Sequence, residues 1–135
     1  MSALDLRVPI SPGELLDKLT ILRIKAARIV DDEKRANVAR ELALLEAIWR
    51  EAVPEPAALR EDEDALARVN EALWDVEDAL REREATQRFD GEFVALARSV
   101  YRHNDERAAI KRRVNVRLGS ALIEEKSYRG GPERR

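Results

Sequence analysis

The chain has 135 residues, of which 39% are charged and only 4% are aromatic, and its net charge is −2. This length suits one domain with a modest core, and so many charges indicate long, solvated helices. The absence of cysteine excludes disulfides and thiolate metal sites, and a single histidine argues against zinc, so we expect no metal and no cofactor. No stretch resembles a membrane span or a signal peptide, which predicts a soluble, cytoplasmic protein.

The first predicted helix begins in ISPGELLDKL, where Ser11 can cap it, Pro12 suits the first helical position and Glu14 completes a capping box. Apolar residues then recur at four-three spacing from position 15 to position 29, which is typical of one helix face. Ile21 and Ile24 lie outside this stripe. The second apolar face indicates contact with a further helix, the terminal segment or another subunit.

A second helix is predicted from about residue 33 to residue 52, because Val38, Leu42, Leu45 and Trp49 repeat the same spacing and the two prolines of VPEP end it. The connection VDDE is short. Short connections join antiparallel neighbours, so the first two helices should form a hairpin.

Residues 53–61 are the only candidate linker, and a third helix follows with apolar positions at 66, 69, 73, 76 and 80. It should end near TQRFDG, where Asp90 can cap a fourth helix that extends from Gly91 to Leu118, with Gly119 in the position of a C-terminal cap. Asn104 and Asp105 are both good caps, so the sequence leaves open whether the fourth helix is continuous through them.

The predicted fold is therefore all-α: a bundle of two long antiparallel helical hairpins (four helices) plus a short C-terminal segment. We expect a single domain over residues 1–128 and a disordered tail over residues 129–135. The helices of the second hairpin should span about 40 Å and those of the first about 30 Å. The second hairpin should then overhang the first, and either the segment SALIEEKSY or a second subunit should cover the exposed apolar stripe, so we expect a homodimer.

A polar interruption marks the fourth helix, because Asn104, Arg107 and Lys111 stand where its apolar stripe should continue. With antiparallel pairing of the third and fourth helices, we expect Glu77 and Asp78 to be the partners of these cations. The predicted polar layer comprises Trp74, Glu77, Asp78, Arg81, Arg98, Asn104, Asp105, Arg107, Lys111 and Asn115, with contributions from Asp17, Lys18 and Lys25 of the first helix. It is either an ion-pair network that fixes helix register or a pocket for an anionic small molecule.

Other candidates are weaker. His103 lies one residue off the stripe, which is typical of a surface or interhelix histidine, and the carboxylates of the third helix lack the Glu-x-x-His pairs of helical metal sites.

Residues 61–84 are acidic and residues 98–117 are basic, which indicates complementary neighbouring helices or a basic face for an acidic partner. The basic segment lacks interleaved exposed aromatic residues, which argues against nucleic-acid binding.

Three blocks carry a family resemblance: GELLDKLTILRIK at 13–25, LWDVEDALRERE at 73–84 and FVALARSVYRHNDERAAIKRRVNVRLGSALIEEKSY at 93–128. With them the chain resembles an uncharacterised bacterial family of small helical proteins, a domain of unknown function. The resemblance implies a stand-alone helical protein associated with genes for cell-surface glycan and lipopolysaccharide assembly. It implies no catalytic residue at any position.

Three functions stay open at this point. The first, which the absence of a nucleophile or metal set favours, is a non-catalytic accessory or binding protein that holds an anionic ligand or a partner protein. The second is a small all-helical enzyme with the architecture of chorismate mutases, in which inward cations stabilise a dianionic transition state. The third is an oligomeric scaffold whose polar layer is structural.

Overall fold

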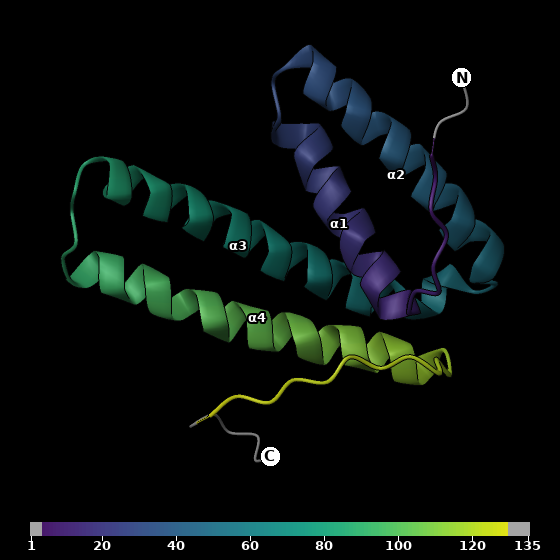
Figure 1. The fold of residues 1–135 in the computed structure, drawn as a ribbon. Helices are drawn as coiled ribbons and strands as arrows, with labels where there is room; N and C mark the ends of the chain where they lie inside the picture. Colours follow the sequence, from purple (N-terminus) through teal and green to yellow (C-terminus); the bar gives the residue numbers. More distant parts are fainter. Residues whose placement is uncertain (1–3, 130–135) are drawn as a thin grey trace.

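The computed structural model describes residues 4–129, which form four long α-helices and one short 3-10 helix (Figure 1). The elements are α1 (Pro12–Arg28), α2 (Asp32–Ala52), η1 (Pro56–Leu59), α3 (Arg60–Ala85) and α4 (Gly91–Arg117). No strand occurs between residues 4 and 129, so the all-α prediction is confirmed. The predicted disordered tail, residues 129–135, lies outside the described residues apart from Arg129.

Side chains cap the first turns of α1, α2 and α4, whereas α3 begins at Arg60, within the predicted linker, without a side-chain cap. The Oγ atom of Ser11 accepts a hydrogen bond from the Glu14 amide, an Asp31 carboxylate oxygen accepts one from the Lys34 amide, and Asp90 caps α4 in the same way. The α4 helix continues without a break through Asn104 and Asp105, which settles the point that the sequence left open. Gly119, with φ of +65°, follows the C-terminal end of α4 in the left-handed conformation that glycine adopts most easily.

The two hairpins cross instead of lying parallel (Figure 1). The α1 helix is the central element, because it packs on α2 and also on both helices of the α3–α4 hairpin. Ile24 of α1 is buried and Ile21 is half-buried, as expected for a helix with more than one covered face. The hairpins thus share a single core, which is built around α1.

That core is small. It consists of three leucines of α1 together with apolar residues of every other element: Leu15, Leu16, Leu19, Trp49, Val53, Leu59, Leu66, Val69, Ile110 and Val114. Burying one such side chain stabilises the folded state by about 1.5–3 kcal/mol. All of the buried positions in α3 and α4 lie near the crossing with α1, at residues 62–70 and 110–115.

The remainder of the α3–α4 hairpin extends beyond α1 as an arm (Figure 1). No residue between positions 71 and 109 is buried, and we call residues 76–101 the outer half of the hairpin. Phe89, Val94 and Tyr101 are each more than half exposed there. The predicted overhang is confirmed.

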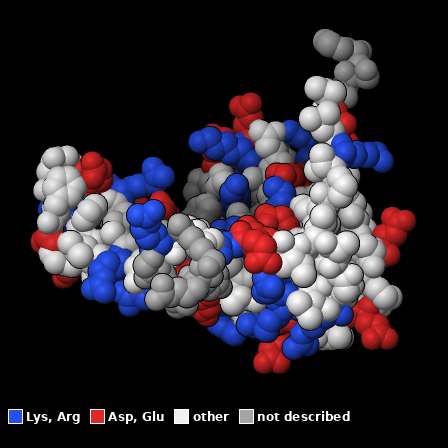
Figure 2. All heavy atoms as spheres, turned by 60° about the horizontal axis from the view of Figure 1, so that its bottom comes forward, with Lys and Arg blue, Asp and Glu red and all other residues white. Residues whose placement is uncertain are grey.

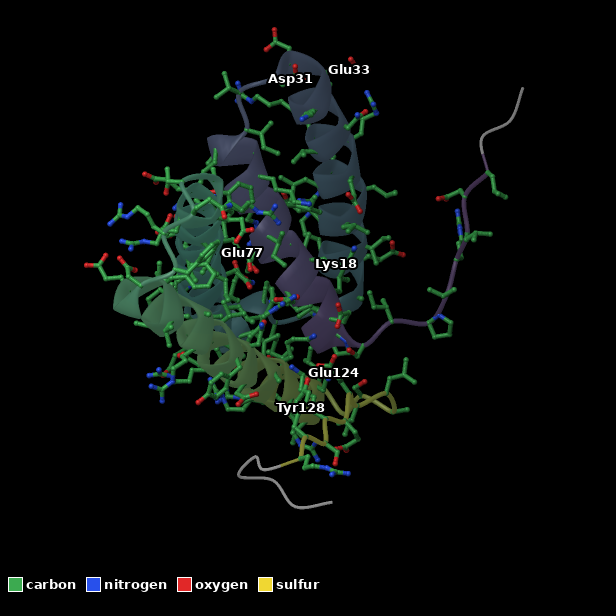
Figure 3. All side chains as sticks on the ribbon, turned by 60° about the vertical axis from the view of Figure 1, so that its left-hand side comes forward. Lys18, Asp31, Glu33, Glu77, Glu124 and Tyr128 are labelled. Carbon is green, nitrogen blue, oxygen red and sulfur yellow. The ribbon has the colours of Figure 1, made fainter. Side chains whose placement is uncertain are left out.

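Residues 118–129, called the C-terminal segment, run back along α4 (Figures 1 and 3). Glu124 and Glu125 fasten the segment by ion pairs to Lys111 and Arg112 of α4, at 3.2 Å in both cases. The segment therefore lies mainly against the end of α4 that is near α1.

Candidate functional site

Asp17 of α1 lies at the centre of the polar layer and is fully buried. Arg107 of α4 donates two hydrogen bonds to it, from Nε to Oδ1 at 2.8 Å and from Nη2 to Oδ2 at 2.5 Å. Two parallel bonds of this kind are among the stronger pairings between side chains. The hydrogen bond to Asp17 raises the pKa of Arg107 although burial lowers it, so the guanidinium stays charged.

Asn70 of α3 connects a third helix to this carboxylate. Its Nδ2 atom donates to Oδ1 of Asp17 and to Oγ1 of Thr20, at 2.9 Å in both cases. The Thr20 hydroxyl donates in turn to the backbone carbonyl of Asp17 at 2.8 Å. Since Asn70 and Thr20 are also buried, one carboxylate joins α1, α3 and α4 without access to solvent.

The N-terminus of α1 approaches α4 unusually closely at Gly13. The Gly13 amide donates to Oδ1 of Asn115 at 2.7 Å. A Cβ atom at this position would lie 2.4 Å from the backbone oxygen of Lys111 and 2.8 Å from Oδ1 of Asn115. Only glycine fits between the two helices there.

Lys111 lies one turn of α4 beyond Arg107 and is buried. Its Nζ atom is 2.7 Å from Oε2 of Glu14 in α1 and 3.2 Å from Oε1 of Glu124 in the C-terminal segment. Burial lowers the pKa of Lys111, but the two carboxylates outweigh that effect and raise the pKa above its ordinary value. The ammonium group is therefore charged, and it is paired with both of these carboxylates.

The structure brings Asp17, Asn104, Arg107, Lys111 and Asn115 together, as predicted, but with different partners. Arg107 pairs with Asp17 of α1, and Lys111 pairs with one carboxylate of α1 and one of the C-terminal segment. The predicted pairing with Glu77 and Asp78 is wrong. Those two side chains are exposed, and Glu77 forms an ion pair with Arg81 on its own helix at 3.8 Å.

Helix register explains this correction. Ala85 ends α3 and Gly91 begins α4, so residues at equal distances from these ends lie at the same level. Arg107 is thus level with Val69, whereas Glu77 is level with Ser99. Glu77 and Asp78 therefore lie in the outer half of the hairpin, about two turns of helix away from the level of Arg107 and beyond the reach of α1.

The other predicted site residues lie outside the layer. The guanidinium of Arg28 lies over the Trp74 ring, 6.0 Å from its centroid. Lys18 faces α2, where its Nζ atom is 4.0 Å from a carboxylate oxygen of Glu41. The remaining ones are the half-buried Lys25, the exposed Arg98, and Asp105, which lines a pocket described below.

Sequence reasoning missed several contributors to the layer. Asn70 directly follows the apolar position Val69, and a polar residue so close to a stripe is a signal that could have been used. Glu14 was recognised only as a capping residue. Gly13 and Glu124 gave no signal, because their roles depend on how α1 and the C-terminal segment approach α4.

A second buried carboxylate, Asp62, ties the start of α3 to the end of α4. Its Oδ1 atom accepts a hydrogen bond from Nε of Arg113 at 3.3 Å. Nε of Arg117 lies 3.3 Å from Oδ2, within ion-pair distance, although the geometry does not make a hydrogen bond. Both arginines are half exposed and Oδ2 of Asp62 is buried without a hydrogen bond, so this carboxylate is less completely paired than Asp17.

Beside the polar layer lies a pocket of about 470 Å³, which we call the tyrosine pocket. Nη1 of Arg107 donates to Oδ1 of Asn104 at 3.4 Å, so Asn104 connects the layer with the pocket. The lining residues come from one face of α4 and from the C-terminal segment: Val100, Tyr101, Asn104, Asp105, Lys126, Tyr128 and Arg129.

The charged groups of the tyrosine pocket differ from those of the layer in being unpaired. Among residues 4–129, neither Asp105 nor Arg129 has an ion-pair partner. Nζ of Lys126 lies 5.9 Å from the centroid of the Tyr128 ring and pairs with no carboxylate of the described chain. Tyr101 and Tyr128 are each more than half exposed.

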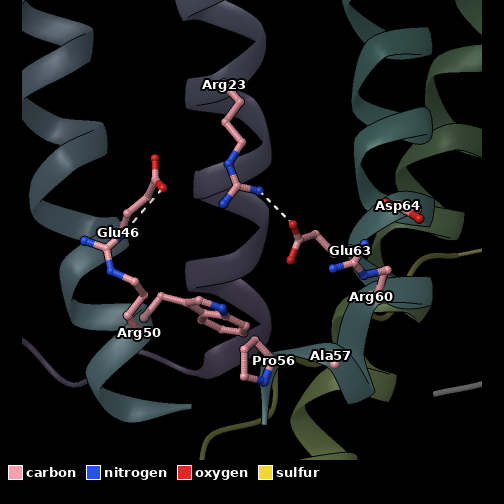
Figure 4. A pocket seen from close by; sticks show the side chains of 9 residues that line it. Arg23, Glu46, Arg50, Pro56, Ala57, Arg60, Glu63 and Asp64 are labelled. Atoms are coloured by element: carbon pink, nitrogen blue, oxygen red, sulfur yellow. Dashed lines mark hydrogen bonds and ion pairs between the residues drawn. The ribbon is translucent and has the colours of Figure 1, made fainter. Parts of the chain in front are cut away.

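A second pocket, of about 430 Å³, lies between α1, α2 and the start of α3 (Figure 4). Trp49 contributes to its lining. Arg23 pairs with Glu63 at 3.0 Å and Arg50 with Glu46 at 3.9 Å, and these ion pairs occupy the walls. An anion would have to compete with these carboxylates, so this pocket is the weaker candidate.

The surface that carries α4 and the C-terminal segment is of mixed charge. Figure 2 shows Lys and Arg side chains interspersed with Asp and Glu side chains on this face. The basic segment of the sequence is therefore largely balanced by acidic neighbours. Within residues 4–129, no group of three or more acidic or histidine side chains is arranged to hold a metal ion.

These observations define a small all-α protein made of two crossed helical hairpins that a self-contained polar layer holds together. The chain belongs to a family of unknown function (DUF6165), whose model matches residues 6–132. No curated protein and no solved structure matches it. None of the helices in residues 4–129 has the length and apolar character needed to cross a bilayer.

Proposed function

We propose that this protein is a cytoplasmic, non-catalytic binding protein and that its tyrosine pocket holds a small anionic ligand with a planar ring. The observation that carries this proposal is the contrast between two neighbouring sites. Every cation of the polar layer is paired with a carboxylate, whereas Lys126 and Arg129 of the pocket are not paired within the described chain.

The pocket offers the groups that such a ligand needs. The faces of Tyr101 and Tyr128 can stack on a ring, and Lys126 and Arg129 can bind a phosphate or carboxylate group. Asn104 and Asp105 supply a donor and an acceptor for ring substituents. The volume of about 470 Å³ falls within the range of about 300–1,000 Å³ that is typical of small-molecule sites.

A sugar nucleotide combines a ring, a diphosphate and hydroxyl groups, and it would connect the pocket with the surface-glycan assembly that the family resemblance implies. The chorismate-mutase alternative loses its basis, because Arg107 and Lys111 are held by Asp17, Glu14 and Glu124. The same ion pairs support a structural role for the polar layer.

Calorimetric titration with UDP-glucose, UDP, inorganic diphosphate and glucose tests the proposal. We expect UDP-glucose or UDP to bind, and both Tyr101→Ala and Lys126→Ala to weaken binding about tenfold, which corresponds to about 1.4 kcal/mol. Arg102→Ala is the matched control, since it removes an exposed cation next to Tyr101 that does not line the pocket. No binding of any probe at millimolar concentration, or equal affinity in all variants, would contradict the proposal.

A further inference from the structure

The α1 helix packs on α3 and α4 near the crossing, whereas no residue of the outer half is buried. We use the term groove for the face of the outer half that continues, along both helices, the rows of residues in contact with α1. On α4, the stripe that receives α1 at Lys111 and Arg107 continues outward through Val100, Ala97 and Phe93. Ala97 is exposed and Phe93 is only half-buried, whereas the half-buried Val100 also lines the tyrosine pocket, next to the C-terminal segment. An apolar helix stripe of this kind is normally covered by another helix.

On α3, the row that meets α1 at Asn70 and Trp74 continues outward as Glu77, Arg81 and Glu84. All three of these outer side chains are exposed. The uncovered groove therefore has one apolar wall, from α4, and one charged wall, from α3. Its occupant must match both walls.

We infer that the occupant is a second copy of this chain, whose outer half packs antiparallel on the outer half of the first. Because α1 covers the inner part of each hairpin, two copies can overlap only with their tips pointing in opposite directions. A twofold axis then lays α4 on α4 and α3 on α3, and the four outer helices form a bundle.

Each wall of the groove can pack against its own copy about one twofold axis, because the matching positions of both walls lie at the same level of the hairpin. Ala79 and Ala97 each lie six residues from the turn, and so they share one level. An axis through this level places Ala97 against its own copy, where the small side chain lets the two helices approach closely. It also sets Glu77 of each chain opposite Arg81 of the other, so opposite charges meet twice.

Unpaired charges around the groove fit the same arrangement. Within the described chain, Asp78, Glu82 and Glu84 of α3 have no ion-pair partner, and neither have Arg98 and Arg102 of α4. An unrelated apolar helix would leave this mixture of charges without partners. A second copy supplies charges of both signs.

Light scattering coupled to size exclusion tests the inference with a matched pair of variants. We expect the natural chain to elute at twice its mass of 15.4 kDa, and Ala97→Arg to elute as a monomer because it buries an unpaired charge, which should raise the dissociation constant by about 100-fold or more. Ala95→Arg should remain a dimer, since Ala95 is exposed on the opposite side of the same helix. Circular dichroism should show equal helix content in all three proteins.

Exchanging the charges of Glu77 and Arg81 tests whether these two residues face each other across the proposed twofold axis. Glu77→Arg or Arg81→Glu alone should weaken the dimer roughly tenfold by opposing like charges, and the double variant should restore it. Because the chain has no cysteine, Ala97→Cys should also form a disulfide between copies on oxidation, whereas Ala95→Cys should not. A monomeric natural chain at 100 µM, or a dimer that Ala97→Arg and the charge exchange leave unchanged, would overturn the inference without affecting ligand binding by the tyrosine pocket.

Discussion

At the scale of single residues, the structure depends most on Asp17, because a fully buried carboxylate is stable only while its partners stay in place. Asp17→Ala leaves Arg107 and Asn70 without their acceptor, so we expect a loss of about 3 kcal/mol in the free energy of unfolding, measured in urea. Glu106→Ala removes an exposed carboxylate of α4 that lies outside the outer half and has no ion-pair partner in the described chain, so it should change stability by less than about 0.5 kcal/mol. Equal effects of the two substitutions would contradict a structural role for the layer.

The sequence could predict one side of this layer but not the other. Arg107, Lys111 and Asn115 stand out because they occupy positions where a helix stripe should be apolar. Their partner Asp17 lies on a helix whose crossing with α4 is set by tertiary packing, and periodicity within one helix contains no information about that crossing. The sequence therefore could not show that α1 and α4 lie close together, and so it could not identify Asp17 as the partner of Arg107.

At the scale of the elements, helix ends could be predicted because caps are local. Ser11, Asp31 and Asp90 each accept a hydrogen bond from the amide three residues ahead. A stretch of four residues therefore contains all the information that is needed to predict such a cap. The path of the C-terminal segment along α4 could not be predicted in the same way, because it depends on ion pairs with residues more than a dozen positions away.

The close approach of α1 to α4 gives a prediction at this scale. Gly13→Ala would place a methyl group against the backbone oxygen of Lys111, so the helices must separate and we expect a loss of about 1–3 kcal/mol in thermal or urea unfolding. Gly91→Ala is the control, since nothing lies within 4 Å of its added methyl group, and it should stabilise α4 by about 0.5 kcal/mol through helix propensity. If Gly13→Ala were as stable as the natural chain, the two helices would not meet at this position.

At the scale of the whole molecule, buried residues are concentrated where the hairpins cross. Stability within a protein follows the distribution of buried contacts, and regions that lack them open at lower free energy. The inner part of the α3–α4 hairpin contains all of its buried side chains, at residues 62–70 and 110–115, and the outer half contains none. One continuous pair of helices should therefore have two different local stabilities.

Hydrogen exchange followed by mass spectrometry measures this difference. In the Ala97→Arg variant, where no second copy should cover the arm, we expect amides in residues 76–85 and 95–101 to exchange at least about tenfold faster than those in residues 66–70 and 110–115. Both groups lie in regular helix, so helix formation alone predicts equal protection and cannot produce the difference. Uniform protection along α3 and α4 would mean that the hairpin opens as one unit and that α1 does not set its local stability.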